Sequence, residues 1–156
     1  MSNENNALLC VYTAETDELL KALMEQNGDS HRISVLRYPE TQKSPKEQAH
    51  VADVLVDLLK KGHNQVVYTH SDHVINRLVY HIVADGVEGD ALGVVNMVKI
   101  FFATEENGGM VVKEIELDSV YGIYDYPKGF FDQYADEQEA ILRTALHKMQ
   151  NLSMTK

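Results

Sequence analysis

The residues best suited to chemistry lie in the hexapeptide YTHSDH, residues 68–73. It follows an apolar, β-rich run and precedes a helical pattern, which predicts a strand-to-helix junction at this point. The backbone N–H groups that open such a helix, from Ser71 to His73, favour an anion. His70 is then placed to hydrogen-bond a phosphate oxygen or an attacking water. This predicts a phosphate-binding edge, with His70 as the catalytic candidate and Ser71 as a cofactor-binding candidate.

On the helix that follows, His73, Arg77 and His81 are spaced four residues apart and share a side. One interpretation extends the phosphate-binding edge to Arg77, which becomes a second cofactor-binding candidate. The other is a capped helix with a solvated polar stripe, and the spacing does not decide between them. His70 and His73, with Asp72, are also residue types that bind metals. Their spacing is not a recognised ligand pattern and no cysteine cluster accompanies them, so we expect no metal site.

A second junction follows the preceding strand of the chain, at RYPETQKSPKEQ, residues 37–48. In phosphate-handling α/β proteins this position usually carries an acid that holds magnesium. Here the predicted strand ends in Arg37 and Tyr38, and Arg37 cannot ligate a cation. The first carboxylate is Glu40, beyond Pro39. Glu40 is either a general base or a turn and capping residue.

A third feature is the aromatic segment YGIYDYPKGFFDQY, residues 121–134, with a turn at Pro127 and Gly129. Tyrosine and phenylalanine anchor many interfaces, which makes Tyr126, Phe130 and Phe131 candidate interface residues. The alternative is a plug that closes the core of the domain.

The motifs of common nucleotide-binding loops are not found in the sequence. It contains neither G-x-x-x-x-G-K-[ST] nor G-x-G-x-x-G, and the Gly108–Gly109 pair falls in a predicted hairpin. Glu15 and Asp17, after the first predicted strand, suggest a Toprim-like phosphotransfer site. Such a site also needs an Asp-x-Asp after a later strand, and none occurs.

These junctions are positioned by alternating strands and helices. Strands are expected over residues 7–14, 31–38, 64–70, 95–104 and 110–118, and helices over 15–26, over 45–61, from Ser71 onward, and over 134–150. The order β-α-β-α-β-α-β-β-α predicts a three-layer α/β fold with a mainly parallel sheet and an antiparallel edge hairpin. The last helix is expected to turn one apolar side inward: Ile141, Leu142, Ala145, Leu146 and Met149.

Composition limits the classes of function. The chain of 156 residues is the length of one domain, 1–156, and its formal net charge of −10 disfavours direct nucleic-acid binding. No apolar run approaches the roughly 18 residues that span a bilayer, and the polar N-terminus does not resemble a secretory signal. The single cysteine, Cys10, lies in an apolar run and is expected to be buried. These features predict a cytoplasmic protein with no membrane partner.

Two stretches together carry a resemblance to a known family: residues 38–78, YPETQKSPKEQAHVADVLVDLLKKGHNQVVYTHSDHVINRL, and DYPKGFFDQ, residues 125–133. The chain resembles the C-terminal part of predicted AAA/ABC-type ATPases related to the OLD and RecF/SMC-like proteins. The resemblance covers residues 33 to 140 and implies half of an ABC-ATPase-like P-loop domain.

The resemblance assigns roles to residues already noted. His70 matches the switch histidine, with Thr69 and Ser71 as its neighbours, and Glu40 matches the Pro-Glu that follows Walker B. The family's C-terminal Pro-x-Gly-Phe-Phe-Asp motif includes Phe130 and Phe131, with Tyr126 where tryptophan is usual.

The departures from the family are large. Arg37 and Tyr38 replace the magnesium-holding acid and its neighbour, Lys43 and Ser44 replace a Leu-His, and the lobe with Walker A and the signature motif is missing. Phosphoryl transfer needs a phosphate cradle, a metal and a positioned water, so autonomous ATP hydrolysis is not expected.

The leading interpretation is a non-catalytic, ATPase-like module that regulates, mimics or adapts a partner protein, such as an ATPase. The alternative is a split ATPase half that supplies His70 to a Walker A-bearing partner, with ATP and magnesium shared between the chains. Relatives in DNA repair and phage defence imply a phage or mobile-element setting. An open sheet edge also makes a homodimer a reasonable expectation.

Overall fold

The structure is a computed structural model that describes residues 7–28, 33–86, 93–123, 126–131 and 133–154. The chain divides into two compact units, Met1–Tyr126 and Pro127–Lys156. Each unit is described by itself. Across the described ranges, no helix is both long and apolar enough to cross a membrane.

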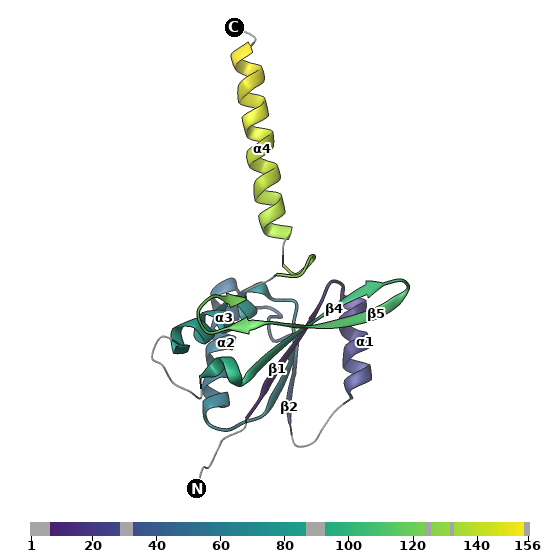
Figure 1. The fold of residues 1–156 in the computed structure, drawn as a ribbon, viewed down its shortest axis with the longest axis vertical. Helices are drawn as coiled ribbons and strands as arrows, with labels where there is room; N and C mark the ends of the chain where they lie inside the picture. Colours follow the sequence, from purple (N-terminus) through teal and green to yellow (C-terminus); the bar gives the residue numbers. More distant parts are fainter. Residues whose placement is uncertain (1–6, 29–32, 87–92, 124–125, 132, 155–156) are drawn as a thin grey trace. The chain divides into compact units, whose positions relative to one another are not determined.

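The first unit is built on a five-stranded sheet (Figure 1). Its strands are β1 (Leu9–Ala14), β2 (Ser34–Arg37), β3 (Gln65–Tyr68), β4 (Val98–Glu106) and β5 (Gly109–Ile115). The order across the sheet is β2-β3-β1-β4-β5. The first four strands are parallel, and β5 pairs antiparallel with β4. The predicted α/β class, with a mainly parallel sheet and an antiparallel edge, is confirmed.

The helices of this unit begin within two residues of the starts that the sequence predicts. They are α1 (Asp17–Asn27), α2 (Pro45–Lys60) and α3 (Asp72–Gly86). The Thr16 side chain caps α1 by accepting from the Leu19 N–H. Ser44 and Glu47 form a reciprocal capping box at α2, with Pro45 in the first turn. These local caps explain why the helix starts could be predicted from the sequence.

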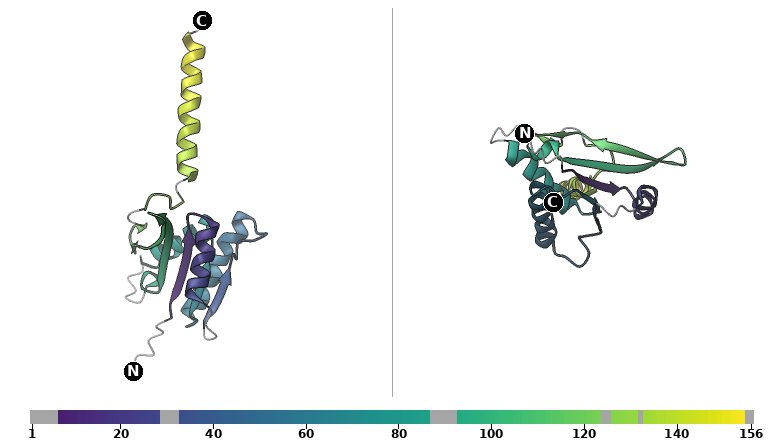
Figure 2. Two further views of the ribbon diagram at one scale, coloured as in Figure 1. Left: turned by 90° about the vertical axis from the view of Figure 1, so that its right-hand side faces the viewer. Right: turned by 90° about the horizontal axis from the view of Figure 1, so that it is seen from below.

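Alternating side chains of the strands pack in two layers, one on each side of the sheet. Leu9 and Val11 are fully buried on the side of the sheet where Gln65 donates a 3.0 Å hydrogen bond to the Leu55 carbonyl of α2. On the other side, Ala14 and Tyr68 pack with the α1 residues in a separate core cluster. Figures 1 and 2 show α1 on one side of the sheet and α2 and α3 on the other.

The single helix α1 leaves part of its side of the sheet uncovered. Tyr12 is half-buried and stacks on Tyr68 and Phe101, with ring centroids 5.3 and 4.9 Å apart. Cys10, on the same side, is also half-buried. Burial raises the pKa of its thiol, an effect that the Lys99 charge partly opposes. Cys10 was expected to be buried, and the structure shows it only half-buried.

The segment after β5 is more divided than the sequence predicted. Residues 110–118 were expected to form one strand, but Leu117–Asp118 forms a separate strand, β6, which pairs antiparallel with β7 (Gly122–Ile123). A short 3₁₀ helix, Val94–Asn96, precedes β4.

The second unit consists mainly of the helix α4 (Gln133–Met154). Its expected apolar side is present, but the side chains are exposed: Ile141 at 62%, Leu142 at 61%, Leu146 at 51% and Met149 at 64%. Among the described residues of the second unit, taken by itself, no core covers these side chains. Periodicity identified an amphipathic helix but could not show what, if anything, covers its apolar face.

Candidate functional site at the strand ends

The carboxyl ends of β1, β2 and β3 meet at one edge of the sheet because these strands are parallel. The helix after β1 lies on one side of the sheet and the helix after β3 lies on the other. Ligands of open α/β sheets bind in the crevice at such a point. Asp17, Tyr38, Glu40 and His70 gather there, and each follows one of the three strands.

Glu40 holds the turn that carries His70. Its Oε1 accepts a 2.7 Å hydrogen bond from the Thr69 hydroxyl, and its Oε2 accepts a 2.9 Å hydrogen bond from the His70 N–H. Thr69 is fully buried. The two carboxylate oxygens therefore hold the Thr69 side chain and the His70 backbone, so Glu40 acts as a turn residue in this arrangement and not as an unengaged base.

The His70 imidazole is anchored by a carboxylate that follows a different strand. Its Nε2 lies 3.1 Å from Asp17 Oδ1, and one third of the side chain remains exposed, at 33%. The imidazole therefore has an orienting acid on one nitrogen and access to solvent. This is the geometry of an oriented general base or hydrogen-bond donor.

Asp17 also accepts a 2.5 Å hydrogen bond from the Tyr38 hydroxyl, and Lys21 lies 3.3 Å from its second oxygen. The hydrogen bonds from Tyr38, from His70 and from Lys21 lower the pKa of Asp17 to about 2. Burial and the adjacent Asp17 carboxylate raise the pKa of Tyr38 to about 12. At neutral pH the cluster therefore contains an ionised Asp17 beside a protonated Tyr38.

Tyr38 adopts a backbone conformation that is uncommon for a non-glycine residue, with φ of 53°. Its N–H still donates to the Tyr68 carbonyl at 2.8 Å, which continues the β2–β3 pairing by one residue. Its carbonyl accepts from the Thr41 N–H and from the Thr41 hydroxyl. These bonds stabilise the turn and hold Tyr38 next to Asp17 despite the backbone strain.

Ser71 has a structural role in the described cluster. Its hydroxyl accepts from the Val74 N–H at 3.0 Å and donates to Gln48 Oε1 at 2.6 Å, while its own N–H donates to the Thr69 hydroxyl. The side chain thus caps α3 and joins it to α2. One of the N–H groups expected to meet an anion is already used.

Arg77 is placed away from His70, on the side of α3 that meets α2. Its Nε donates to Asp53 Oδ1 at 2.8 Å, and His81 Nε2 lies 2.6 Å from the same oxygen. Burial tends to raise the pKa of Asp53, but the hydrogen bonds from Arg77 and His81 outweigh it and lower the pKa overall. Arg77 and His81, which were expected to share a side of the helix, therefore both bind Asp53 of α2 and join α3 to α2.

His73 does not take part in that pair, and its Nε2 lies 3.7 Å from Asp72. No group of three or more metal-binding side chains occurs among the residues whose positions are described.

The candidate interface residues differ in exposure. Tyr126 is 55% exposed, whereas Phe130 is buried at 1%. Phe130 packs edge-on against Phe131 within the second unit, with ring centroids 4.8 Å apart. The Phe130 N–H closes a turn onto the Pro127 carbonyl. Of the candidate interface residues, Phe130 is thus buried and Tyr126 is more than half exposed.

Sequence reasoning identified His70 and Glu40 but gave no role to Tyr38. Asp17 was considered only as part of a Toprim-like site. The three residues Asp17, Tyr38 and His70 are joined only when β2, β3 and β1 assemble in that spatial order. The available sequence signal was the presence of a polar residue just after each of the three parallel strands.

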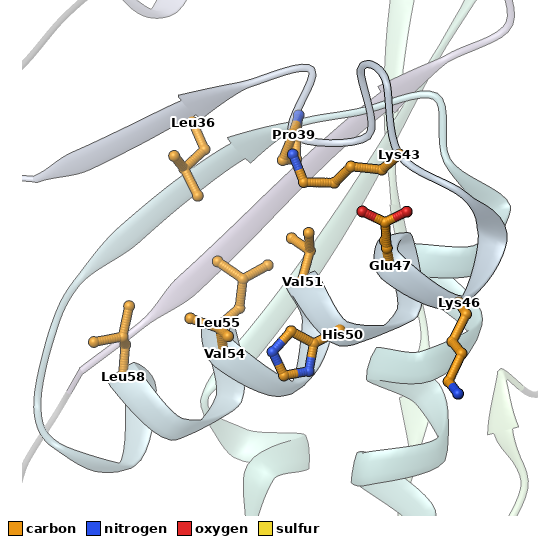
Figure 3. A pocket seen from close by; sticks show the side chains of 10 residues that line it. All are labelled: Leu36, Pro39, Lys43, Lys46, Glu47, His50, Val51, Val54, Leu55 and Leu58. Atoms are coloured by element: carbon orange, nitrogen blue, oxygen red, sulfur yellow. The ribbon is translucent and has the colours of Figure 1, made fainter.

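A second candidate surface, which the sequence analysis missed, is a groove between β2 and α2 (Figure 3). It has a volume of about 700 Å³, and Figure 3 shows Leu36 of the strand opposite apolar side chains of the helix. Lys43 and Glu47 lie near Pro39 at one end. The lining residues are Leu36, Pro39, Lys43, Lys46, Glu47, His50, Val51, Val54, Leu55 and Leu58.

Comparisons of this chain with protein-family models, with curated proteins and with solved structures found no match.

Proposed function

We propose that this protein is a non-catalytic, ATPase-like interaction module that regulates, mimics or adapts a partner protein. The observation that carries the proposal is the connection after β1, which lies beside His70. A phosphate-binding strand–loop–helix unit needs a glycine-rich loop whose N–H groups surround the phosphates. Here only Glu15 and Thr16 separate β1 from α1, and Asp17 follows at once.

The charges at the strand ends oppose nucleotide binding. Asp17 is ionised at neutral pH, because its pKa is about 2, and its carboxylate already binds His70. A negative charge 4 Å from a phosphate charge costs about 4 kcal/mol at an effective dielectric of 20. The carboxylate of Asp17 thus already occupies Nε2 of His70, the residue that, by the resemblance, would contact a phosphate.

The metal site of the resembled ATPases also has no equivalent in the sequence of β2. That strand ends at Arg37, and a guanidinium cannot ligate magnesium. What remains is the layered fold and an exposed Tyr126, which suit a module that binds protein. The net charge of −10 disfavours direct nucleic-acid contact. We place the module in the cytoplasm, in a phage, defence or DNA-repair setting.

Calorimetric titration with ATP and magnesium tests the proposal. We expect no binding at high micromolar nucleotide by the unmodified protein or by His70→Ala. The Asp17→Asn variant removes the repelling charge and keeps the side-chain shape. Binding by Asp17→Asn alone would show that the carboxylate blocks a latent site. Binding by the unmodified protein that is lost in His70→Ala would contradict the proposal.

Affinity purification from the native host, with the unmodified chain as bait, provides the second test. We expect a protein partner to co-purify, and an ATPase is the first class to look for. Recovery of the chain without any protein partner would count heavily against the proposal.

A split ATPase half is the second candidate function, and the geometry of His70 favours it. Glu40 fixes the backbone of His70, Asp17 orients its ring, and a third of the side chain is exposed. A histidine held in this way could act on a nucleotide bound by a Walker A-bearing partner. In that case His70→Ala abolishes the ATPase activity of the assembled pair. If the chain is only a docking module, the same substitution leaves that activity unaffected.

A further inference from the structure

Each of the two units carries an apolar surface. One is the groove between β2 and α2, where Leu36 is 37% exposed and Val54 is 45% exposed. The other is the apolar face of α4, where Leu142, Leu146 and Met149 are each more than half exposed. Contiguous apolar surfaces of this kind mark sites of protein contact.

We propose that the groove between β2 and α2 binds helix α4 of a second copy of this chain. Because each copy contains both surfaces, the exchange is reciprocal and closes as a two-fold symmetric dimer. An amphipathic helix in an apolar groove is a recurring recognition mode.

The two surfaces match in length. The groove residues on α2 run from Glu47 to Leu58, and the apolar face of α4 runs from Ile141 to Leu152. At 1.5 Å per residue each interval measures about 16 Å. At 100° per residue the apolar side chains of α4 cover a sector about 140° wide, the width expected of a helix packed against a surface.

The charges of the two surfaces are complementary. In a chain of net charge −10, one end of the groove carries Lys43 and Lys46 (Figure 3). Its one acid, Glu47, is engaged in the capping box with Ser44. The first turns of α4, in contrast, carry Asp136 and Glu137, while Glu139 is paired with Arg143 of the same helix. Opposite charges therefore meet when the start of α4 lies at the lysine end of the groove.

Pairing of α4 with α4 of the second copy satisfies the charges less well. A parallel pair places the acidic first turns side by side. An antiparallel pair centred on the apolar face places Asp136 and Glu137 past Met154, the last residue of the other helix. The charge pattern thus favours the groove as the surface that receives α4.

Sedimentation equilibrium of the full chain tests the proposal with matched variants. Val54→Glu changes the groove, and Leu146→Glu changes α4; both positions are exposed, so we expect the variants to fold. Controls are Val112→Glu, at an exposed position of β5, and His147→Glu, on the polar side of α4. We expect a dimer that Val54→Glu and Leu146→Glu each weaken by at least about tenfold, while the controls match the unmodified chain.

Charge exchange tests the direction of the helix in the groove. Lys46→Glu and Glu137→Lys should each weaken the dimer, and the double variant should recover most of the loss. None of these variants alters Asp17, Tyr38, Glu40 or His70, so the result is independent of the proposed function.

Disulfide trapping identifies the contacting surfaces directly. Chains with Cys10→Ser and Val54→Cys are mixed with chains carrying Cys10→Ser and Leu146→Cys, and a covalent heterodimer is expected under mild oxidation. Three results overturn the proposal. These are a monomeric unmodified chain at high micromolar concentration, a dimer that only Leu146→Glu dissociates, and covalent Leu146→Cys homodimers without the heterodimer.

Discussion

Asp17 connects three strand ends through one carboxylate. It follows β1, accepts the Tyr38 hydroxyl from the end of β2, and lies 3.1 Å from His70 after β3. The hydrogen bonds it accepts lower its pKa from 3.8 to about 2. Its contribution to stability is therefore fully present above about pH 4 and is lost as the pH falls through about 2.

The Tyr38 hydroxyl is the first cause of that shift, so we expect Tyr38→Phe to raise the pKa of Asp17 toward 3.8. Carboxyl chemical shifts followed by NMR during an acid titration measure the change. The matched control is Tyr80→Phe, which removes the hydroxyl of an exposed tyrosine on α3. An Asp17 pKa that stays near 2 in Tyr38→Phe would show that His70 and Lys21 are sufficient to lower it.

Residue types alone located part of this cluster. His70 and Glu40 were predicted because each follows a recognisable strand and precedes a helix with a clear start. The pairing of His70 with Asp17 spans 53 residues, and that of Tyr38 with Asp17 spans 21. No local pattern encodes either contact, because each depends on which strands become neighbours.

At the scale of elements, the short β6–β7 hairpin packs closely on α3. Gly122 in β7 has φ of 79°, and a Cβ at this position would lie 2.4 Å from Val79 Cγ1 of α3. The position therefore requires glycine for its backbone conformation and for the close approach of the two elements.

We expect Gly122→Ala to lower the free energy of unfolding by about 2–4 kcal/mol, from backbone strain and overpacking together. Gly108→Ala is the matched control, because Gly108 has φ of 80° but nothing lies within 4 Å of the added Cβ. It should cost about 1–2 kcal/mol, from strain alone. Urea unfolding monitored by circular dichroism gives both values. Equal losses would mean that the hairpin moves away from α3 at little cost.

At the scale of the whole molecule, the core and the α4 face use the same residue types with different consequences. Leu55 of α2 is 1% exposed, whereas Leu142 of α4 is 61% exposed. Removing a buried leucine side chain costs transfer free energy and leaves a cavity. Removing an exposed leucine side chain does neither.

We therefore expect Leu55→Ala to lower the free energy of unfolding by about 2–5 kcal/mol, and Leu142→Ala to change it by less than about 0.5 kcal/mol. Both are measured by urea unfolding in dilute solution, below the concentration of self-association. A large loss for Leu142→Ala under those conditions would show that α4 packs within its own chain.

The sequence by itself determined the order of elements, most helix starts, the mainly parallel sheet and two members of the strand-end cluster. These follow from local signals: hydrophobic periodicity, caps such as Ser44 with Glu47, and turn residues. Only the tertiary structure decided that Asp17 and Tyr38 close on His70 and that Arg77 joins α2 to α3. The physical reason is that these contacts depend on the spatial order of strands and on burial, which arise from packing between segments distant in the chain.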